Sequence, residues 1–203
     1  MATYLTWIGE LFKKGDNYSR SKPIILSIAP ADPAQLGQMV EAIQAFRRSI
    51  METTQVHYHP GSEESPSYTD RVLAVELNTS CPNIPGHPPP SYDLPTLVPL
   101  LRVFADAYRS DPTLVLGLKL APYVYRAQME AVVEAIADLT DEQGGGNPIA
   151  FLTCTNTLGG CVMFADQAKT PEGLVSQNTN SAMALPTTFG GLAGEPLHCL
   201  SLG

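Results

Sequence analysis

The side chains best suited to chemistry in this sequence gather around Cys81. The thiol lies in the run ELNTSCPN, residues 76–83, with Asn78 and Asn83 on either side of it. A free cysteine thiol has a pKa of about 8.5 and becomes a nucleophile or a base only when it is deprotonated. No His or Asp is adjacent in the sequence, so a Cys/His hydrolase pair would need a distant partner. The residue types alone leave three roles open for Cys81: nucleophile, general base, or a buried cysteine without chemistry.

Other polar residues follow further apolar runs. Lys119 ends the run LVLGL, where its ammonium either reaches solvent along the rim of the fold or faces a bound anion. Asn156 follows a later run and, with Asn78 and Asn83, offers amide groups suited to a planar, amide-rich ligand. A single Asn is also common in turns. The glycine-rich run 190–194 could bring backbone amides close to a phosphate, although it is a weak signal alone.

Apolar runs alternate regularly with helical periodicity, which predicts the elements that position these residues. We expect strands at 23–29, 72–77, 113–120 and 149–153. A helix should begin at Asp32-Pro33 and another near Asp93, because Asp is a preferred N-cap and Pro is favoured at the first helical position. Three apolar stripes mark the buried helix faces: Leu36, Met39, Val40, Ile43 and Phe46; Leu97, Leu100, Leu101, Phe104 and Tyr108; and Met129, Val132, Val133, Ile136 and Leu139.

The repeated strand-helix pattern predicts an α/β fold with parallel strands covered by helices. A doubly wound sheet and a TIM (β/α)8 barrel both satisfy the pattern. Polar residues at successive strand ends favour the barrel, in which these ends meet at one mouth, and no GxGxxG motif opens the first helix. We expect the polar stretch 53–70 to be a surface insertion, and the chain beyond residue 153 to be irregular and glycine-rich.

Composition narrows the function classes. A net charge of −8 and the absence of a basic cluster disfavour nucleic-acid binding. The apolar runs are too short for a membrane span. The segment Met1–Glu10 lacks the features of a secretion signal, so we expect a cytoplasmic protein with reduced cysteines. His57 and His59 could clamp a metal, but they have no carboxylate-rich partner set, so no metal site is expected.

Four motifs of the chain resemble those of dihydroorotate dehydrogenase, most closely the soluble, FMN-containing branch that uses fumarate. They are residues 76–86 (ELNTSCPNIPG), 117–123 (GLKLAPY), 155–159 (TNTLG) and 189–194 (FGGLAG). The first is specific, and the four occur in the family's order and approximate spacing. The resemblance implies a TIM barrel that carries FMN and oxidises (S)-dihydroorotate to orotate in pyrimidine (UMP) biosynthesis, with fumarate as acceptor and a homodimer as the expected assembly.

The same resemblance implies roles for individual residues. Cys81 matches the catalytic base that removes a proton from substrate C5 while a hydride leaves C6 for the flavin. Lys119 matches a lysine beside the flavin, where a cation stabilises developing negative charge. The matched substrate-binding positions are Asn78, Asn83, Asn156 and Thr157, and the matched cofactor-binding positions are Asn78, Lys119, Thr155 and Gly194. Thr157 replaces the family's usual Ser and keeps the hydroxyl, while Ala193 stands where Gly is usual.

Some pieces of the family pattern have no counterpart in residues 1–203. They are an N-terminal flavin-binding Lys, a substrate-gripping loop and the last glycine-rich phosphate loops. We therefore expect one partial barrel domain over residues 1–203, with about half to two-thirds of the barrel present. Two alternatives to the dehydrogenase remain open: a family fragment without flavin or activity, and another pyrimidine-oxidising flavin barrel.

Overall fold

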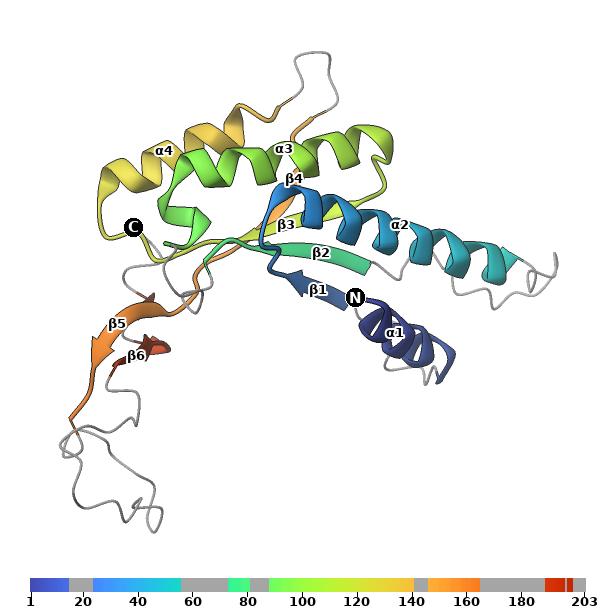
Figure 1. Cartoon of the computed structure of the whole chain (residues 1–203), viewed down its shortest axis with the longest axis horizontal. Helices are drawn as coiled ribbons and strands as arrows, with labels where there is room; N and C mark the ends of the chain where they lie inside the picture. The colour runs from blue at the N-terminus through green and yellow to red at the C-terminus, as the bar shows by residue number, and fades with distance from the viewer. Residues whose placement is uncertain are drawn as a thin grey trace, which may run out of the picture.

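The protein is described by a computed structural model that places most of the chain. The residues described are 1–14, 24–55, 73–80, 88–140, 146–164, 189–195 and 197–198. Within them the fold is α/β, with helices packed on a four-stranded parallel sheet and a separate two-stranded antiparallel pair reached from the end of the sheet (Figure 1).

The strands and helices follow one another along the chain in the predicted alternation. The strands are β1 (Ile24–Ile28), β2 (Leu73–Asn78), β3 (Val115–Lys119), β4 (Ile149–Thr153), β5 (Leu158–Val162) and β6 (Phe189–Leu192). The helices are α1 (Ala2–Lys14), α2 (Pro33–Gln55), α3 (Leu94–Ser110) and α4 (Arg126–Ala137), with a short 3₁₀ helix, η3, at Pro90–Tyr92.

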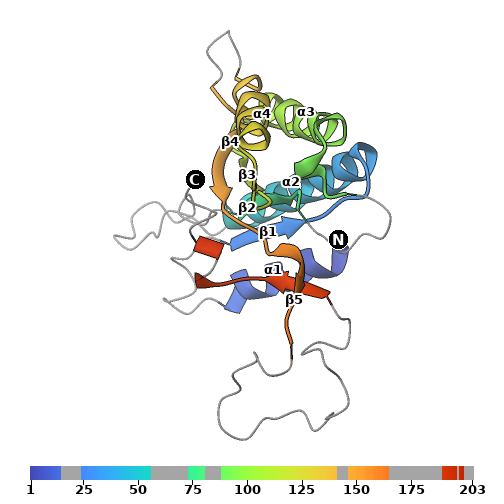
Figure 2. The ribbon, with the colours of Figure 1, turned by 90° about the vertical axis from the view of Figure 1, so that its left-hand side faces the viewer.

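The main sheet has the strand order β1-β2-β3-β4, and every neighbouring pair is parallel. Helices α2, α3 and α4 connect these strands and lie on the same face of the sheet (Figures 1 and 2). A doubly wound sheet instead reverses its strand order at a switch point and carries helices on both faces. Sequential order with one covered face is consistent with part of a (β/α)8 barrel.

The core lies between the helices and this face of the sheet, as the apolar stripes predict. Leu36 and Ile43 of α2, Leu101 and Phe104 of α3, and Leu77 of β2 are all fully buried. The prediction fails for Val133, the third stripe residue of α4, which is 60% exposed. It lies next to Val132 in the sequence and therefore about 100° around the helix, past the edge of the buried stripe.

The helix starts are predicted well, although the two capping residues act differently. The Oδ1 atom of Asp32 accepts a hydrogen bond of 2.8 Å from the backbone amide of Gln35, as expected for an N-cap. Asp93 precedes α3, but its carboxylate accepts from the hydroxyl of Thr96 and caps no backbone amide. The sequence therefore predicts the position of this N-cap correctly, but the Asp93 carboxylate bonds a side chain and not the helix backbone.

Several features of the chain were not predicted. The chain beyond residue 153 is not all irregular, because β5 pairs with β6 antiparallel and the expected glycine-rich loop at Gly190 and Gly191 lies within β6. No element was assigned to the start of the chain, where α1 packs on α2. Helix α2 extends to Gln55, three residues into the predicted insertion, and 56–70 lie outside the described residues.

Among the helices of the described ranges, none has the length and apolarity that crossing a membrane requires.

Gly117 of β3 is a place where the sheet has no room for a side chain. A Cβ atom built there would lie 2.3 Å from ring carbons of Phe151, which belongs to the neighbouring strand β4. The Phe151 ring therefore packs across β3 at the position that a larger residue would fill. This close approach explains why a glycine interrupts an otherwise apolar strand.

Gly117→Ala should consequently destabilise the fold by about 1–3 kcal/mol, the usual range for overpacking, measured as the free energy of unfolding in urea. The matched control is Gly37→Ala in α2, where nothing lies within 4 Å of the added Cβ. That substitution should instead stabilise by up to about 1 kcal/mol, because Gly is a poor helix former. Equal stability changes at the two glycines would contradict the packing argument.

Candidate active site

Three strands that carry or precede predicted site residues end at a common edge of the sheet. Asn78 is the last residue of β2 and pairs in register with Lys119, the last residue of β3, which in turn pairs with Thr153 of β4. Since residues in register on parallel strands point to the same face, these three side chains share one face. It is the face opposite the helices, because the intervening residues Leu77 and Leu118 are fully buried in the core.

Asn78 and Asn156 are joined directly. The amide nitrogen of Asn156 donates to the backbone carbonyl of Ser80 at 3.0 Å and to Oδ1 of Asn78 at 3.4 Å. The same Oδ1 accepts from the backbone amide and the hydroxyl of Ser80, at 3.2 and 3.3 Å. All of these bonds use the oxygen of Asn78, so within the described part of the chain its NH₂ group is left to face a ligand.

The backbone of Lys119 is held from β2. Its carbonyl accepts from the amide and the hydroxyl of Thr79, at 3.3 and 2.8 Å, and from the hydroxyl of Ser80 at 3.3 Å. Thr79 is fully buried, and its hydroxyl also lies 2.5 Å from that of Ser91. The strand end that carries the ammonium is therefore rigidly placed, and the next residue after this cluster is Cys81.

Unlike the arginines that form the described ion pairs, Lys119 has no carboxylate partner among the described residues. Ion pairs within the described ranges join Arg47 to Asp111, Arg109 to Asp106 and Arg126 to Glu130, and none includes Lys119. Lys119 is thus a half-buried cation without a carboxylate partner in the described part of the chain, and such a cation is suited to an anionic or electron-rich ligand group. Among the residues that the structure describes, the sheet edge thus presents one ammonium and one unbonded amide NH₂ on the same face.

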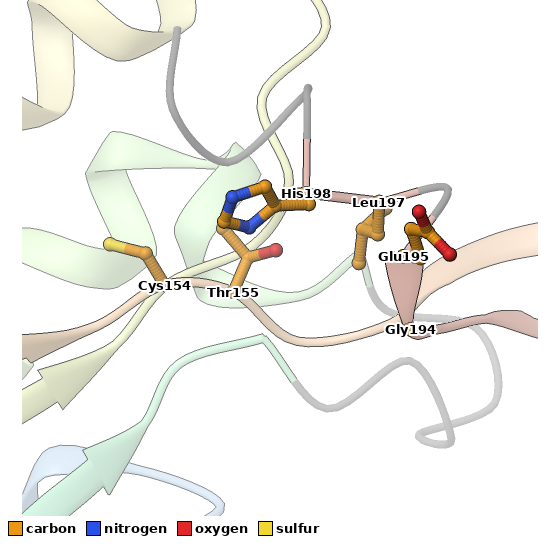
Figure 3. A pocket seen from close by; sticks show the side chains of 6 residues that line it. All are labelled: Cys154, Thr155, Gly194, Glu195, Leu197 and His198. Carbon is orange, nitrogen blue, oxygen red and sulfur yellow. The ribbon is translucent and has the colours of Figure 1, made fainter.

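A second group of predicted residues lines a pocket of about 420 Å³. It contains Thr155 and Gly194, together with Cys154, Glu195, Leu197 and His198, and Figure 3 shows the imidazole of His198 extending toward Thr155. The hydroxyl oxygen of Thr155 is buried and has no hydrogen-bond partner within the described residues. Gly194 has φ of +79°, a conformation that other residues rarely adopt. The structure therefore brings these two predicted cofactor positions into one pocket.

Thr157 lies against strand β6. The backbone amide of Thr157 donates to Oδ1 of Asn156 at 2.8 Å. A Cβ atom added at Gly191 of β6 would lie 2.5 Å from the hydroxyl oxygen of Thr157. The NH₂ and the oxygen of the Asn156 side chain are both hydrogen-bonded within the chain, and the Thr157 side chain packs against β6. Their predicted role in substrate binding stays a prediction.

The predicted residues therefore form two groups. Asn78, Lys119 and Asn156 lie together at the sheet edge, whereas Thr155 and Gly194 line the pocket, and the adjacent residues 155 and 156 join the two groups. Cys81 and Asn83, the predicted base and substrate ligand, lie outside the described residues.

The pair His57 and His59 also lies outside the described residues. Among the residues that are described, no group of three or more His, Cys, Asp or Glu side chains could hold a metal ion.

Glu76 is a site residue that the sequence did not single out. It is only 6% exposed, and both of its carboxylate oxygens are hydrogen-bonded to hydroxyl groups, one on Ser27 of β1 and one on Thr153 of β4. The available signal was a carboxylate within the apolar strand predicted at 72–77, but its partners are 49 and 77 residues away in the sequence. Only the folded sheet brings them together.

Tyr123 adds a buried phenol to the end of β3. The pKa of Tyr123 is raised to about 12, chiefly by burial and to a lesser extent by Tyr92 and Cys154, while a hydrogen bond with Ser91 acts in the opposite direction. The Tyr92 ring packs edge-on against that of Tyr123, with centroids 6.0 Å apart, and its hydroxyl donates to the carbonyl of Pro122 at 3.0 Å. Tyr123 therefore stays protonated at neutral pH and cannot serve there as a base.

Comparisons with known proteins give the chain clear relatives. No protein-family model matches it. It is 27% identical over 195 residues to a Streptococcus pyogenes protein named dihydroorotate dehydrogenase A (fumarate), covering 95% of this chain and 45% of that protein. It is 26% identical over 181 residues to dihydroorotate dehydrogenase (fumarate) of Trypanosoma brucei brucei, covering 88% of this chain and 44% of that protein.

A shorter match is stronger in identity. Over 125 residues, 60% of this chain and 31% of the relative, it is 34% identical to a dihydroorotate dehydrogenase A (fumarate) of Streptococcus pneumoniae. The chain spans about half the length of the curated relatives that it matches along most of its sequence. The resemblance predicted from the four motifs is thereby confirmed: over nearly its whole length, the chain is similar to proteins named dihydroorotate dehydrogenase (fumarate).

Proposed function

We propose that this chain provides part of an FMN-dependent dihydroorotate dehydrogenase, which oxidises (S)-dihydroorotate to orotate and passes the electrons to fumarate. The observation that carries the proposal is the meeting of Asn78, Lys119 and Asn156 at one sheet edge, in a chain whose relatives bear that name. The proposal includes residues 1–203 as part of a barrel domain, a cytoplasmic location, and a homodimer. Sequential parallel strands with one helix-covered face support the barrel.

The described residues fit a flavin in their donor chemistry. Lys119 offers an ammonium without a carboxylate partner among the described residues, and the buried hydroxyl of Thr155 lacks a partner there. Gly194 lines the same 420 Å³ pocket as Thr155, and this volume lies in the range of about 300–1,000 Å³ that is usual for small-molecule sites. We assign Asn78, Lys119, Thr155 and Gly194 to hold FMN, which when bound accepts a hydride from the substrate.

The remaining polar residues are assigned to the substrate. Asn78, Asn83, Asn156 and Thr157 supply hydrogen bonds to the ring amides and the carboxylate of dihydroorotate, because amide and hydroxyl groups both donate and accept. Cys81 follows Ser80, whose hydroxyl contacts the carbonyl of Lys119. Its thiolate removes the proton from substrate C5, and the thiol formed in this step must release that proton before the next turnover.

The experiment that tests this function is a titration of the purified chain with FMN, followed by anaerobic addition of dihydroorotate. We expect saturable binding, seen as quenched flavin fluorescence, and bleaching of the bound flavin by dihydroorotate but not by dihydrouracil. Fumarate should then restore the oxidised absorbance. The dihydrouracil comparison separates this enzyme from other pyrimidine-oxidising flavin barrels.

Two results would contradict the proposal. If FMN fails to bind the folded chain at saturating concentration, the chain is a relative of the family that carries no flavin. Bleaching by dihydrouracil in place of dihydroorotate would assign the chain to another pyrimidine substrate.

A further inference from the structure

Glu76 is a buried carboxylate in the middle of β2. Its neighbours along the strand, Val75 and Leu77, are fully buried in the core beneath the helices. Because successive side chains of a strand point to opposite faces, Glu76 lies on the other face, which it shares with Asn78 and Lys119. It is nevertheless only 6% exposed. A carboxylate is rarely kept so far from water without a reason in the structure.

The carboxylate links three strands. Its Oε1 accepts from the hydroxyl of Ser27 on β1 at 2.6 Å, and its Oε2 accepts from the hydroxyl of Thr153 on β4 at 2.5 Å. The side chain must cross β3 to reach Thr153, past Gly117, the β3 residue in register with it, over which the Phe151 ring packs. Hydrogen bonds to an ionised acceptor are shorter and roughly twice as strong as neutral ones.

The β4 end of this link leads directly into the candidate site. Thr153 is the last residue of β4, and its carbonyl accepts from the amide of Leu120 at 3.1 Å. The amide of Asn156 donates to the carbonyl of Leu120 at 2.8 Å, and its side chain reaches Ser80 and Asn78. The segment that carries Thr155 and Asn156 is therefore tied to β2 at two levels, by Glu76 below and by Asn156 above.

We propose that Glu76 is a positioning residue of the candidate active site. By holding the hydroxyl of Thr153, its carboxylate fixes the segment from which Thr155 and Asn156 extend, opposite Asn78 and Lys119. The ligand of this site rests on the function proposed above, whereas the fixing of the segment does not. Ser27 is not expected to position the site. Its side chain is exposed on β1, the edge strand of the described sheet, where water can replace its hydroxyl.

The two arms of the carboxylate allow a matched test. Thr153→Val keeps the β-branched shape and removes the hydroxyl from the β4 arm, while Ser27→Ala removes the hydroxyl from the β1 arm. Glu76→Gln keeps the size of the side chain and one acceptor, so it should fold where Glu76→Ala fails to. All three are compared with the unchanged chain.

The first readout is hydrogen exchange of single backbone amides by NMR, which needs no ligand. Thr153→Val should accelerate exchange at Leu120 and Asn156 by about tenfold, the loss expected for a hydrogen bond to a charged acceptor. Glu76→Gln should show a smaller acceleration at the same amides. Ser27→Ala should change them by less than about twofold, since water replaces its hydroxyl. Equal effects of the two arms, or no acceleration in Thr153→Val, would overturn the proposal.

The second readout is the dissociation constant for FMN. Thr153→Val and Glu76→Gln should weaken binding by up to about tenfold, and Ser27→Ala by less than about twofold, in parallel with the exchange data. An exchange pattern as expected, with FMN binding equal in all variants, would overturn the positioning of the flavin site. Failure of the unchanged chain to bind FMN would instead refute the proposed function, and the exchange pattern would still decide the role of Glu76.

Discussion

Replacing Cys81 by serine should leave FMN binding unchanged and lower the rate of flavin reduction by dihydroorotate by about 10²–10⁴-fold near neutral pH, the usual contribution of a positioned proton acceptor. A serine hydroxyl is a far weaker base than a thiol when no activating partner is present. The loss should shrink as the pH rises, because hydroxide then takes over part of the proton removal. Stopped-flow absorbance of the bound flavin between pH 6 and 10 measures both effects.

The chain offers a matched control in Cys161→Ser. Cys161 lies in β5, and its thiol donates to the backbone carbonyl of Leu158 at 3.3 Å. The Cys161→Ser variant makes the same substitution in a residue outside the proposed catalytic and binding groups. Its rate of flavin reduction should therefore stay within about twofold of that of the unchanged chain. A Cys81→Ser chain that reduced flavin as fast as this control would remove Cys81 from the mechanism.

The main sheet could be predicted because its strands are near-continuous apolar runs, whereas the helices that cover it are apolar on one face only. The predicted strand 149–153 is the same as β4, and the others agree with the structure within a few residues. The β5–β6 pair escaped prediction for a physical reason. Phe189–Leu192 is half glycine and has little intrinsic preference for a strand, so its strand conformation depends on pairing with β5, about thirty residues earlier in the chain.

The candidate site was predictable where it depends on strand ends alone. Parallel strands deliver their carboxyl ends to one edge, and this rule was enough to place Asn78, Lys119 and Asn156 together. It could not show that Asn156 is bonded to both Asn78 and Ser80, because side-chain hydrogen bonds depend on rotamers. Nor could it find Glu76, whose hydroxyl partners are set by register across the whole sheet.

Lys119→Ala should weaken FMN binding by about 10–100-fold, which corresponds to the loss of one hydrogen bond to a charged donor worth about 1.5–3 kcal/mol. The ammonium has no carboxylate partner among the described residues, so its removal leaves no protein charge unpaired there. Loss of the cation should also slow reduction of the bound flavin, since negative charge develops on the ring as it is reduced. Fluorescence titration and stopped-flow reduction measure the two effects separately.

Two further variants separate charge from geometry. Lys119→Arg keeps the positive charge and should recover part of the affinity, but the planar guanidinium cannot reproduce the point charge of an ammonium. Arg109→Ala makes the same change in net charge near the end of α3, which precedes the start of β3 and so lies at the opposite end of the sheet. Arg109 forms an exposed pair with Asp106, so its loss should leave flavin binding within about twofold. A Lys119→Ala chain that matched the Arg109→Ala chain in flavin affinity and in reduction rate would mean that the ammonium does not face the flavin, and the proposed arrangement of this sheet edge would be wrong.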